Sequence, residues 1–318
     1  MIRLLLVASI LLVALAVFTV PRRHEIDGIS MAPALRPGDI VSSGWLPQSD
    51  HLVPPRRFER WLLRAPDGTP VIKRVVGLPG ETIRISGGDL VIDDSPLLTP
   101  PMILAECASA VADCGPVAGH WQRSFSREDI YDDADFAPEE SRWLLPVRDV
   151  GLAAVINSTQ RASITTAIRI GDRAIRWSLP AGRFALVAGR LDGHLVATAW
   201  NLAASPASIG RSPLPPHPPE AWQIVTPWVA STGDRDALPL LALSLAADDG
   251  PLDATVVDRC VERCLVWRDM LHRPPAEGTA SWEISSGEIF VLGDFPSGSR
   301  DSRHWGPLPV NSLFHRAR

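Results

Sequence analysis

Short alternating or β-branched apolar runs, separated by turn residues, dominate the first third of the chain. Residues 71–76 (VIKRVV) form a β-branched run closed by glycine and proline, residues 82–85 (TIRI) alternate, and residues 90–92 (LVI) follow a Gly-Gly turn. No segment between 26 and 98 shows strong helical periodicity. The pattern therefore predicts an antiparallel β structure.

A second set of strand-like runs lies between residues 147 and 203, with turn residues at the spacing expected of a β-sandwich. The proline-rich segment 213–219 is typical of a stiff linker or long loop. Residues 287–292 (GEIFVL) then resume the first pattern. We expect a mainly β protein, in which an inserted β-rich domain at 143–275 interrupts a β domain formed by 23–142 and 276–318.

The N-terminal residues carry an apolar run. Residues 4–20 contain only two polar side chains, Ser9 and Thr19, and this length is the short end of the membrane-spanning range. A cleaved secretory signal is the alternative, because Ala14-Leu15-Ala16 resembles a cleavage site. The run continues past Ala16, which favours a retained transmembrane helix at residues 1–22. No second run reaches spanning length, so we expect the rest of the chain on one side of the bilayer.

Charge and cysteine content narrow the function classes. The net charge is −5 and no basic block is present, which argues against nucleic-acid binding. The four cysteines form two close pairs in the sequence, Cys107 with Cys114 and Cys260 with Cys264. Each pair is either a disulfide in an oxidising compartment or two thiols. The spacing of zinc ligands is absent, so we expect no metal.

Lysine is almost missing from the chain. Of the 31 Lys and Arg residues, only Lys73 is a lysine. A codon bias toward arginine explains this at the protein surface, where either cation serves. Arginine cannot lose its proton, whereas a lysine buried in an apolar strand has a lowered pKa and can act as a general base. A structural lysine on a strand is the alternative interpretation.

Three segments place Lys73 in a wider pattern. They are residues 28–39 (GISMAPALRPGD), 72–81 (IKRVVGLPGE) and 293–306 (GDFPSGSRDSRHWG). In this order, behind an apolar anchor, they resemble the type I signal peptidases, which use a serine–lysine dyad. The resemblance covers about residues 1–100 and 281–318, and it implies a signal-peptidase-like antiparallel β catalytic domain.

The resemblance assigns roles to residues of this chain. It implies that Ser30 is the nucleophile, that Lys73 is its general base, and that Ser299 orients the lysine. Asp301 and Arg303 fall on a supporting polar pair. A structural ion pair is the alternative for these last two residues.

The resemblance also covers the oxyanion site and the Gly-Asp box. The backbone N–H of Ser30 is the implied first oxyanion donor, and Gly28 stands where some members of the family supply a second. Asp294 is the acid of the Gly-Asp box. Phe295 and Ala34 depart from the residues usual in the family, and Arg74 is equally well explained as structural.

The implied activity is that of a serine endopeptidase, held in the cell membrane by one helix, which removes signal peptides from exported precursors through an acyl-enzyme. It requires no cofactor, and its partners are signal-peptide-bearing precursors and the lipid bilayer. The resemblance also implies a catalytic domain outside the cytoplasm, which favours disulfides. Two alternatives stay open: a peptidase dedicated to one partner, and an anchored binding protein whose insert holds an envelope ligand on an inactive scaffold.

Overall fold

The protein was analysed as a computed structural model, which describes residues 22–43, 54–117, 120–123, 130–132, 145–160, 163–202, 212–228, 241–247, 250–274 and 280–317. The described chain is mainly β, as predicted. The expected transmembrane segment, residues 1–22, lies outside these ranges except for Arg22. Within the described residues, no helix has the length and hydrophobicity needed to cross a bilayer.

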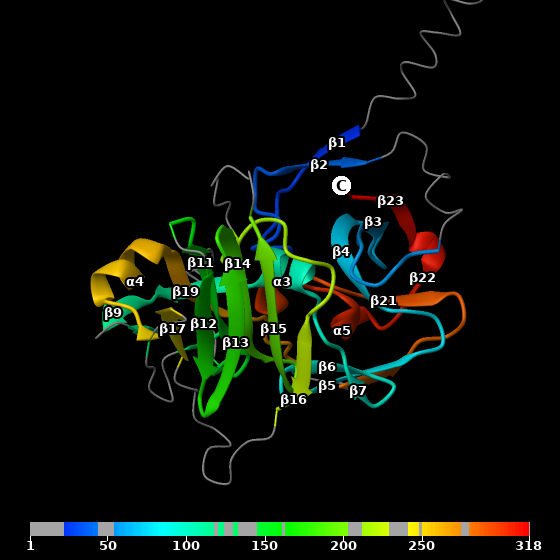
Figure 1. Ribbon diagram of the computed structural model, residues 1–318. Helices are drawn as coiled ribbons and strands as arrows, with labels where there is room; N and C mark the ends of the chain where they lie inside the picture. The colour runs from blue at the N-terminus through cyan, green and yellow to red at the C-terminus, as the bar shows by residue number, and fades with distance from the viewer. Residues whose placement is uncertain are drawn as a thin grey trace, which may run out of the picture. The chain divides into compact units, whose positions relative to one another are not determined.

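The chain divides into two compact units, and Figure 1 gives their elements. The first unit contains residues 1–95 and 272–318, and the second contains residues 96–271. The second unit thus begins well before residue 143. The reason is that strands between residues 109 and 123 pair with strands of the second unit rather than with those of the first.

A five-stranded antiparallel sheet is the centre of the first unit, in the order β22-β21-β4-β3-β23. Its strands are β3 (Arg60–Arg64), β4 (Pro70–Gly77), β21 (Glu288–Leu292), β22 (Leu308–Pro309) and β23 (Leu313–Arg316). Strand β4 is buried from Ile72 to Gly77 because apolar side chains cover both of its faces. This sheet therefore brings residues near 73 next to residues near 291, although more than 200 positions separate them.

Smaller elements complete the first unit. A four-stranded sheet has the order β20-β5-β6-β7, and β1 pairs with β2. Their bounds are β1 (Arg22–Glu25), β2 (Ile40–Ser43), β5 (Thr82–Ser86), β6 (Asp89–Ile92), β7 (Ser95–Pro96) and β20 (Ser281–Glu283). Three short helices follow β21, namely η1 (Pro296–Gly298), α5 (Ser302–Trp305) and η2 (Val310–Ser312).

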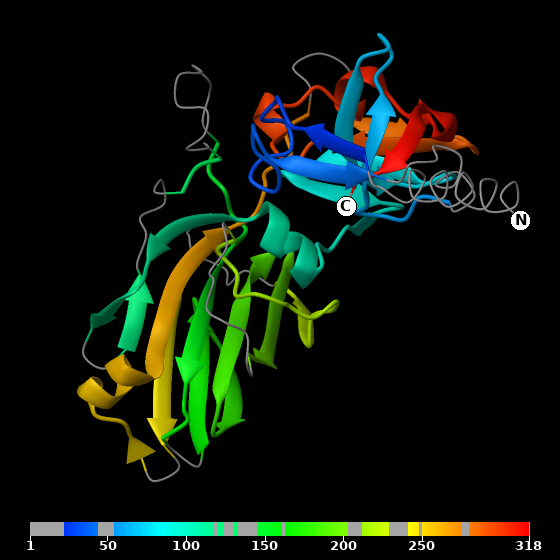
Figure 2. The ribbon, with the colours of Figure 1, turned by 90° about the horizontal axis from the view of Figure 1, so that it is seen from above.

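The second unit has two antiparallel sheets. One has the order β13-β12-β17-β10-β9 with β18 beside β17, and the other has the order β16-β15-β14-β11-β19-β8. Figure 2 shows the long green strands of the latter side by side. The strands are β8 (Ser109–Asp113), β9 (Gly115–Val117), β10 (His120–Arg123), β11 (Val150–Asn157), β12 (Ser163–Ile170), β13 (Arg173–Pro180), β14 (Arg183–Leu191), β15 (His194–Asn201), β16 (Ile224–Pro227), β17 (Leu241–Ala247), β18 (Gly250–Pro251) and β19 (Val261–Arg268). Two helices, α3 (Pro101–Cys107) and α4 (Ala254–Cys260), accompany them.

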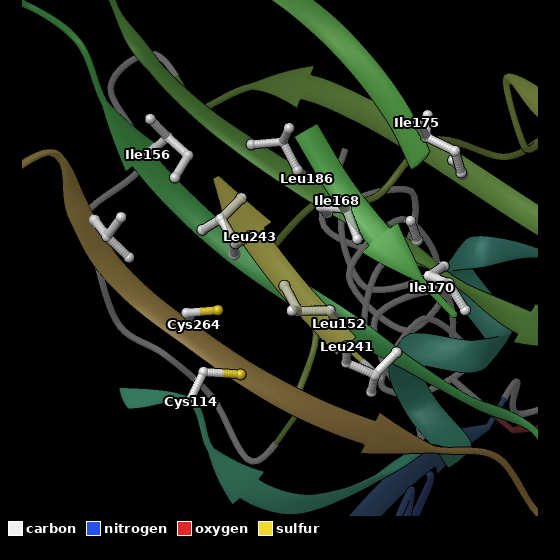
Figure 3. Close-up of a cluster of buried hydrophobic side chains, with 14 of the residues drawn as sticks. Cys114, Leu152, Ile156, Ile168, Ile170, Ile175, Leu186, Leu241, Leu243 and Cys264 are labelled. Atoms are coloured by element: carbon white, nitrogen blue, oxygen red, sulfur yellow. The ribbon is translucent and has the colours of Figure 1, made fainter. Parts of the chain in front are cut away.

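One apolar core joins these two sheets. Leu152, Leu186 and Val266 from one sheet and Ile168 and Leu243 from the other belong to the same buried cluster, much of which is drawn in Figure 3. Alternate residues of each strand point into this core, as the period of two requires. The strand runs recognised between 147 and 203 correspond to β11–β15.

The opposite face of the β11 sheet is built around one tryptophan. Trp267 on β19 is fully buried, and Gly151 and Gly189 lie opposite each other on β11 and β14 beneath its indole ring. A Cβ atom on Gly151 would lie 2.2 Å from the ring, and one on Gly189 would lie 2.4 Å from it. Only glycine leaves room for the ring at these two positions.

Candidate active site

Strand β4 carries Lys73 into the interior of the first unit. Lys73 lies opposite Trp61 of β3 and is only 2% exposed. Its Nζ atom donates a hydrogen bond of 2.9 Å to Ser299 Oγ, which comes from the segment after η1. The structure therefore brings together the lysine and the serine that the sequence predicted as its partner.

The surroundings of Lys73 lower the pKa of its amine from 10.5 to about 8. Burial is the largest cause, because it penalises the charged form. The negative charges of Asp301 and Asp294 oppose this change, and the positive charge of Arg303 adds to it. A substantial fraction of the amine is therefore neutral near pH 8, as a general base requires.

Arg303 holds the segment that presents Ser299. Its guanidinium donates to the carbonyl oxygens of Pro296 at 2.7 Å and Ser299 at 3.3 Å, and to that of Arg273 at 3.2 Å. Two further hydrogen bonds, each 2.8 Å, reach the two carboxylate oxygens of Asp301. This bidentate pair is 3% and 0% exposed. Arg303 thus fixes the backbone on both sides of Ser299.

Asp301 fixes the same loop from inside. It is the N-cap of α5, accepting from the backbone N–H of Arg303 at 3.2 Å, and it also accepts from the N–H of Gly293 at 3.0 Å. Burial raises the pKa of Asp301, but hydrogen bonds with His304 and Arg303 and the charge of Arg303 outweigh burial and hold the pKa below its usual range. Asp301 is therefore a carboxylate at any pH at which the lysine titrates.

A second buried ion pair joins β4 to the end of β21. Arg74 donates from Nε to Asp294 Oδ1 at 2.8 Å and from Nη2 to Asp294 Oδ2 at 2.6 Å. Its Nη1 also donates to the Phe58 carbonyl at 2.8 Å. Because Arg74 follows Lys73 directly, this pair fixes the strand that carries the lysine relative to the loop that carries Ser299.

Gly293 is the point where the Ser30 segment approaches this loop. A Cβ atom there would lie 2.2 Å from Ser299 Oγ and 2.4 Å from the Ser30 carbonyl oxygen. The N–H of Phe295 donates to the same carbonyl at 3.1 Å. The structure thus places the backbone of Ser30 and the hydroxyl of Ser299 around one glycine, and Met31, at 1% exposure, anchors the Ser30 segment in the core.

Ser30 is a half-buried residue. Within the part of the chain that the structure describes, Ser30 Oγ forms no hydrogen bond with Lys73 Nζ, whose partner is Ser299. Gly28, the position of the second oxyanion donor in some family members, is exposed, and a Cβ atom there would meet nothing within 4 Å. No second donor is supplied by a side chain at this position.

The sequence did not indicate His272, a buried residue whose charge interacts with those of Arg303, Asp301 and Asp294. It is 9% exposed, and its backbone N–H donates to the Gly88 carbonyl at 2.8 Å. Burial, together with the charge of Arg303, lowers the pKa of His272 to about 4, against the charges of Asp301 and Asp294. The residue lies in an irregular segment with no pattern in the sequence that marks it, so only the tertiary structure reveals its place.

Comparison with known proteins identifies the family of the chain. The family model described as "Signal peptidase, peptidase S26" matches residues 1–140 and 266–318, which is more than half of the chain. The chain therefore belongs to the signal peptidase family S26, a membrane-associated family of peptidases that remove signal peptides from precursor proteins. This confirms the resemblance to type I signal peptidases.

One curated relative matches more locally. Signal peptidase I V of Bacillus subtilis (strain 168) is 25% identical over 150 residues, which is 43% of this chain and 84% of that protein. The family match omits residues 141–265, the larger part of the second unit.

Proposed function

We propose that this chain is a membrane-anchored serine endopeptidase that removes signal peptides from exported precursors, with Ser30 as nucleophile and Lys73 as general base. The observation that carries this proposal is the buried amine of Lys73, hydrogen-bonded to Ser299 Oγ at 2.9 Å, within the segments that match the family. A lysine whose pKa is lowered to about 8 has the property that the chemistry needs.

The first step is attack by serine. Neutral Lys73 takes the proton of the Ser30 hydroxyl as Oγ attacks the scissile carbonyl carbon. The oxyanion that forms accepts from the backbone N–H of Ser30. Lys73 then gives the proton to the leaving amine, and the acyl-enzyme is left. A water molecule, deprotonated by the same amine, releases the new carboxyl end of the signal peptide.

Ser299 acts in this scheme as a positioning residue. Its hydroxyl holds Lys73 Nζ in place before substrate binds. The Arg303–Asp301 pair in turn fixes the backbone of Ser299. The hydrogen bond between Ser30 and Lys73 forms when substrate is bound, since catalytic hydrogen bonds often tighten only in the substrate complex. The ion pairs Arg303–Asp301 and Arg74–Asp294 therefore contribute by holding the Ser299 loop and strand β4 in fixed positions relative to each other.

The substrate in this proposal is the extended segment that ends a signal peptide. It binds as an added strand beside a sheet edge, with small residues at the first and third positions before the cut. Ser30 follows the apolar run at residues 4–20 by about ten residues, so the nucleophile lies near the bilayer surface, where such a segment emerges. The catalytic unit is on the extracytoplasmic side.

The decisive test is cleavage of an exported precursor by the full chain in detergent. Ser30→Ala and Lys73→Arg each abolish cleavage, because the first removes the nucleophile and the second supplies a cation that cannot act as a base. Ser95→Ala, an exposed change on β7, is the matched control and retains activity. Substantial residual activity in Lys73→Arg contradicts the assignment of the base.

Two further measurements separate the alternatives. A β-lactam-type acylating inhibitor labels Ser30 in an active peptidase, whereas a binding protein on an inactive scaffold stays unlabelled. Comparison of several unrelated precursors separates a general signal peptidase, which cleaves most of them, from a peptidase dedicated to one partner.

A further inference from the structure

Two cysteines that are distant in the sequence are neighbours across the sheet of the second unit. Strands β8 and β19 pair with Asp113 opposite Leu265. One residue further along, the backbone N–H of Cys114 donates to the carbonyl of Cys264 at 2.9 Å. Directly opposed residues in a hydrogen-bonded antiparallel pair have Cα atoms about 5.5 Å apart. This separation is within the range that a disulfide spans.

The two side chains also point the same way. Cys114 and Cys264 are 4% and 2% exposed and belong to the same apolar core. Figure 3 shows the side chains of Cys114 and Cys264 near each other, with both sulfur atoms pointing in the same direction. The two pairings that are close in the sequence are Cys107 with Cys114 and Cys260 with Cys264. Cys107 and Cys260 are the last residues of α3 and α4, so strand pairing places neither of them opposite its proposed partner.

Burial decides when such a bond can form. A hydrogen bond between the two cysteine side chains and burial raise the pKa of the Cys264 thiol. Because the thiolate is the reactive form, the native dithiol exchanges slowly with external disulfides. Oxidation therefore has to precede closure of the core.

We propose that Cys114 and Cys264 are joined by a structural disulfide, made while the second unit folds outside the cytoplasm. The thiolate of one cysteine attacks the disulfide of an external oxidant. This attack forms a mixed disulfide and releases one thiol of the oxidant. The thiolate of the other cysteine then displaces the second oxidant sulfur. Two protons and two electrons leave the cysteines, and the oxidant disulfide becomes two thiols.

The positions of the two cysteines in the sequence predict that this bond stabilises the second unit strongly. Cys114 lies near the start of the second unit and Cys264 near its end, so the bond closes a loop of about 150 residues, for which a large stabilisation is expected. We expect reduction to lower the melting temperature of this unit by roughly 10 °C. The proposal rests on the extracytoplasmic location proposed above.

Peptide mapping of the full chain tests the bond directly. The protein is produced in a bacterial membrane, thiols are blocked with N-ethylmaleimide before lysis, and the unreduced protein is digested with trypsin and Asp-N. These cuts separate all four cysteines, with Cys114 in residues 113–123, Cys264 in 264–268 and Cys260 in 260–263. A peptide linking 113–123 to 264–268 is the expected product. Blocked thiols at Cys114 and Cys264, or a link to another cysteine, overturns the proposal.

A pair of double variants adds a second measurement. The melting temperature of Cys107→Ala/Cys260→Ala falls on adding reductant as much as that of the wild type, whereas Cys114→Ala/Cys264→Ala does not respond. An equal response in both variants contradicts the proposal. If the second variant fails to fold, the peptide map of the wild type still decides. Precursor cleavage by the same preparation separates this question from the proposed function. If the protein cleaves the precursor while Cys114 and Cys264 are blocked thiols, the disulfide proposal is refuted and the proposed function is not.

Discussion

The ionisation of Lys73 leads to a prediction for activity against pH. With a pKa of about 8, the neutral fraction of the amine is about 1% at pH 6, about 9% at pH 7 and about 90% at pH 9. Because only the neutral amine accepts the Ser30 proton, kcat/KM rises about tenfold per pH unit below 8 and levels off above it. An ordinary lysine would place the same rise near pH 10.5.

The measurement is hydrolysis of an internally quenched peptide with alanine at the first and third positions before the cut. The full chain is assayed in detergent micelles between pH 5.5 and 10, at substrate concentrations well below KM. Lys73→Arg serves as the background at each pH, and circular dichroism confirms that the fold persists over the range.

Among the described residues of this unit, no other group with a shifted pKa is moved toward pH 8. The pKa of His272 is lowered to about 4, and burial, His315 and Arg22 lower the pKa of His24 below 6.5. A rise centred near pH 8 therefore belongs to the lysine. A flat profile from pH 6 to 9, or an inflection near 10.5, refutes the argument that burial prepares Lys73 as the base.

Three more predictions follow from packing and burial. Gly293→Ala brings a Cβ atom within 2.4 Å of both Ser299 Oγ and the Ser30 carbonyl oxygen. We expect at least a hundredfold loss of kcat/KM and a destabilisation of about 1–3 kcal/mol. Gly115→Ala, whose Cβ atom meets nothing within 4 Å, is the control and changes neither kcat/KM nor stability in the same assays. Lys73→Met abolishes cleavage yet raises the free energy of unfolding at pH 7 by about 1–3 kcal/mol, since a buried charge is removed. In wild type the cost of that charge is fully present below pH 8 and disappears as pH rises to 10.5, so denaturant titrations should show the advantage of Lys73→Met shrinking over that interval. Gly189→Ala collides with Trp267 and should lower the melting temperature of the second unit, whereas an unchanged transition in calorimetry contradicts the packing argument.

Local patterns predicted much of the architecture. The β-branched run at 71–76 lies in β4, and GEIFVL corresponds to β21. The prediction that Ser299 contacts Lys73 is consistent with the structure, as is the pairing of Asp301 with Arg303. The strands follow from a period of two that can be read along a single segment, whereas the contact of Ser299 with Lys73 was implied by the resemblance to type I signal peptidases.

Features that depend on distant pairing were not visible in the sequence. The second unit begins at Pro96 because β8 pairs with β19, about 150 positions further along the chain. The same pairing places Cys114 beside Cys264, which is 150 positions further along the chain. The contact of Arg303 with the Arg273 carbonyl likewise joins segments that no local pattern connects. The roles of Ser30 and Gly28 remain predictions.

The presence of a single lysine makes the proposed base accessible to spectroscopy without any mutation. Growth on lysine labelled with ¹⁵N at Nζ gives this protein one isotopically marked side chain, which lies in β4 and is 2% exposed. Its chemical shift reports the protonation state directly, and it needs no assignment because no other lysine contributes a signal. In this chain, the ionisation of one buried group can be followed in the intact enzyme while inhibitor or peptide is added.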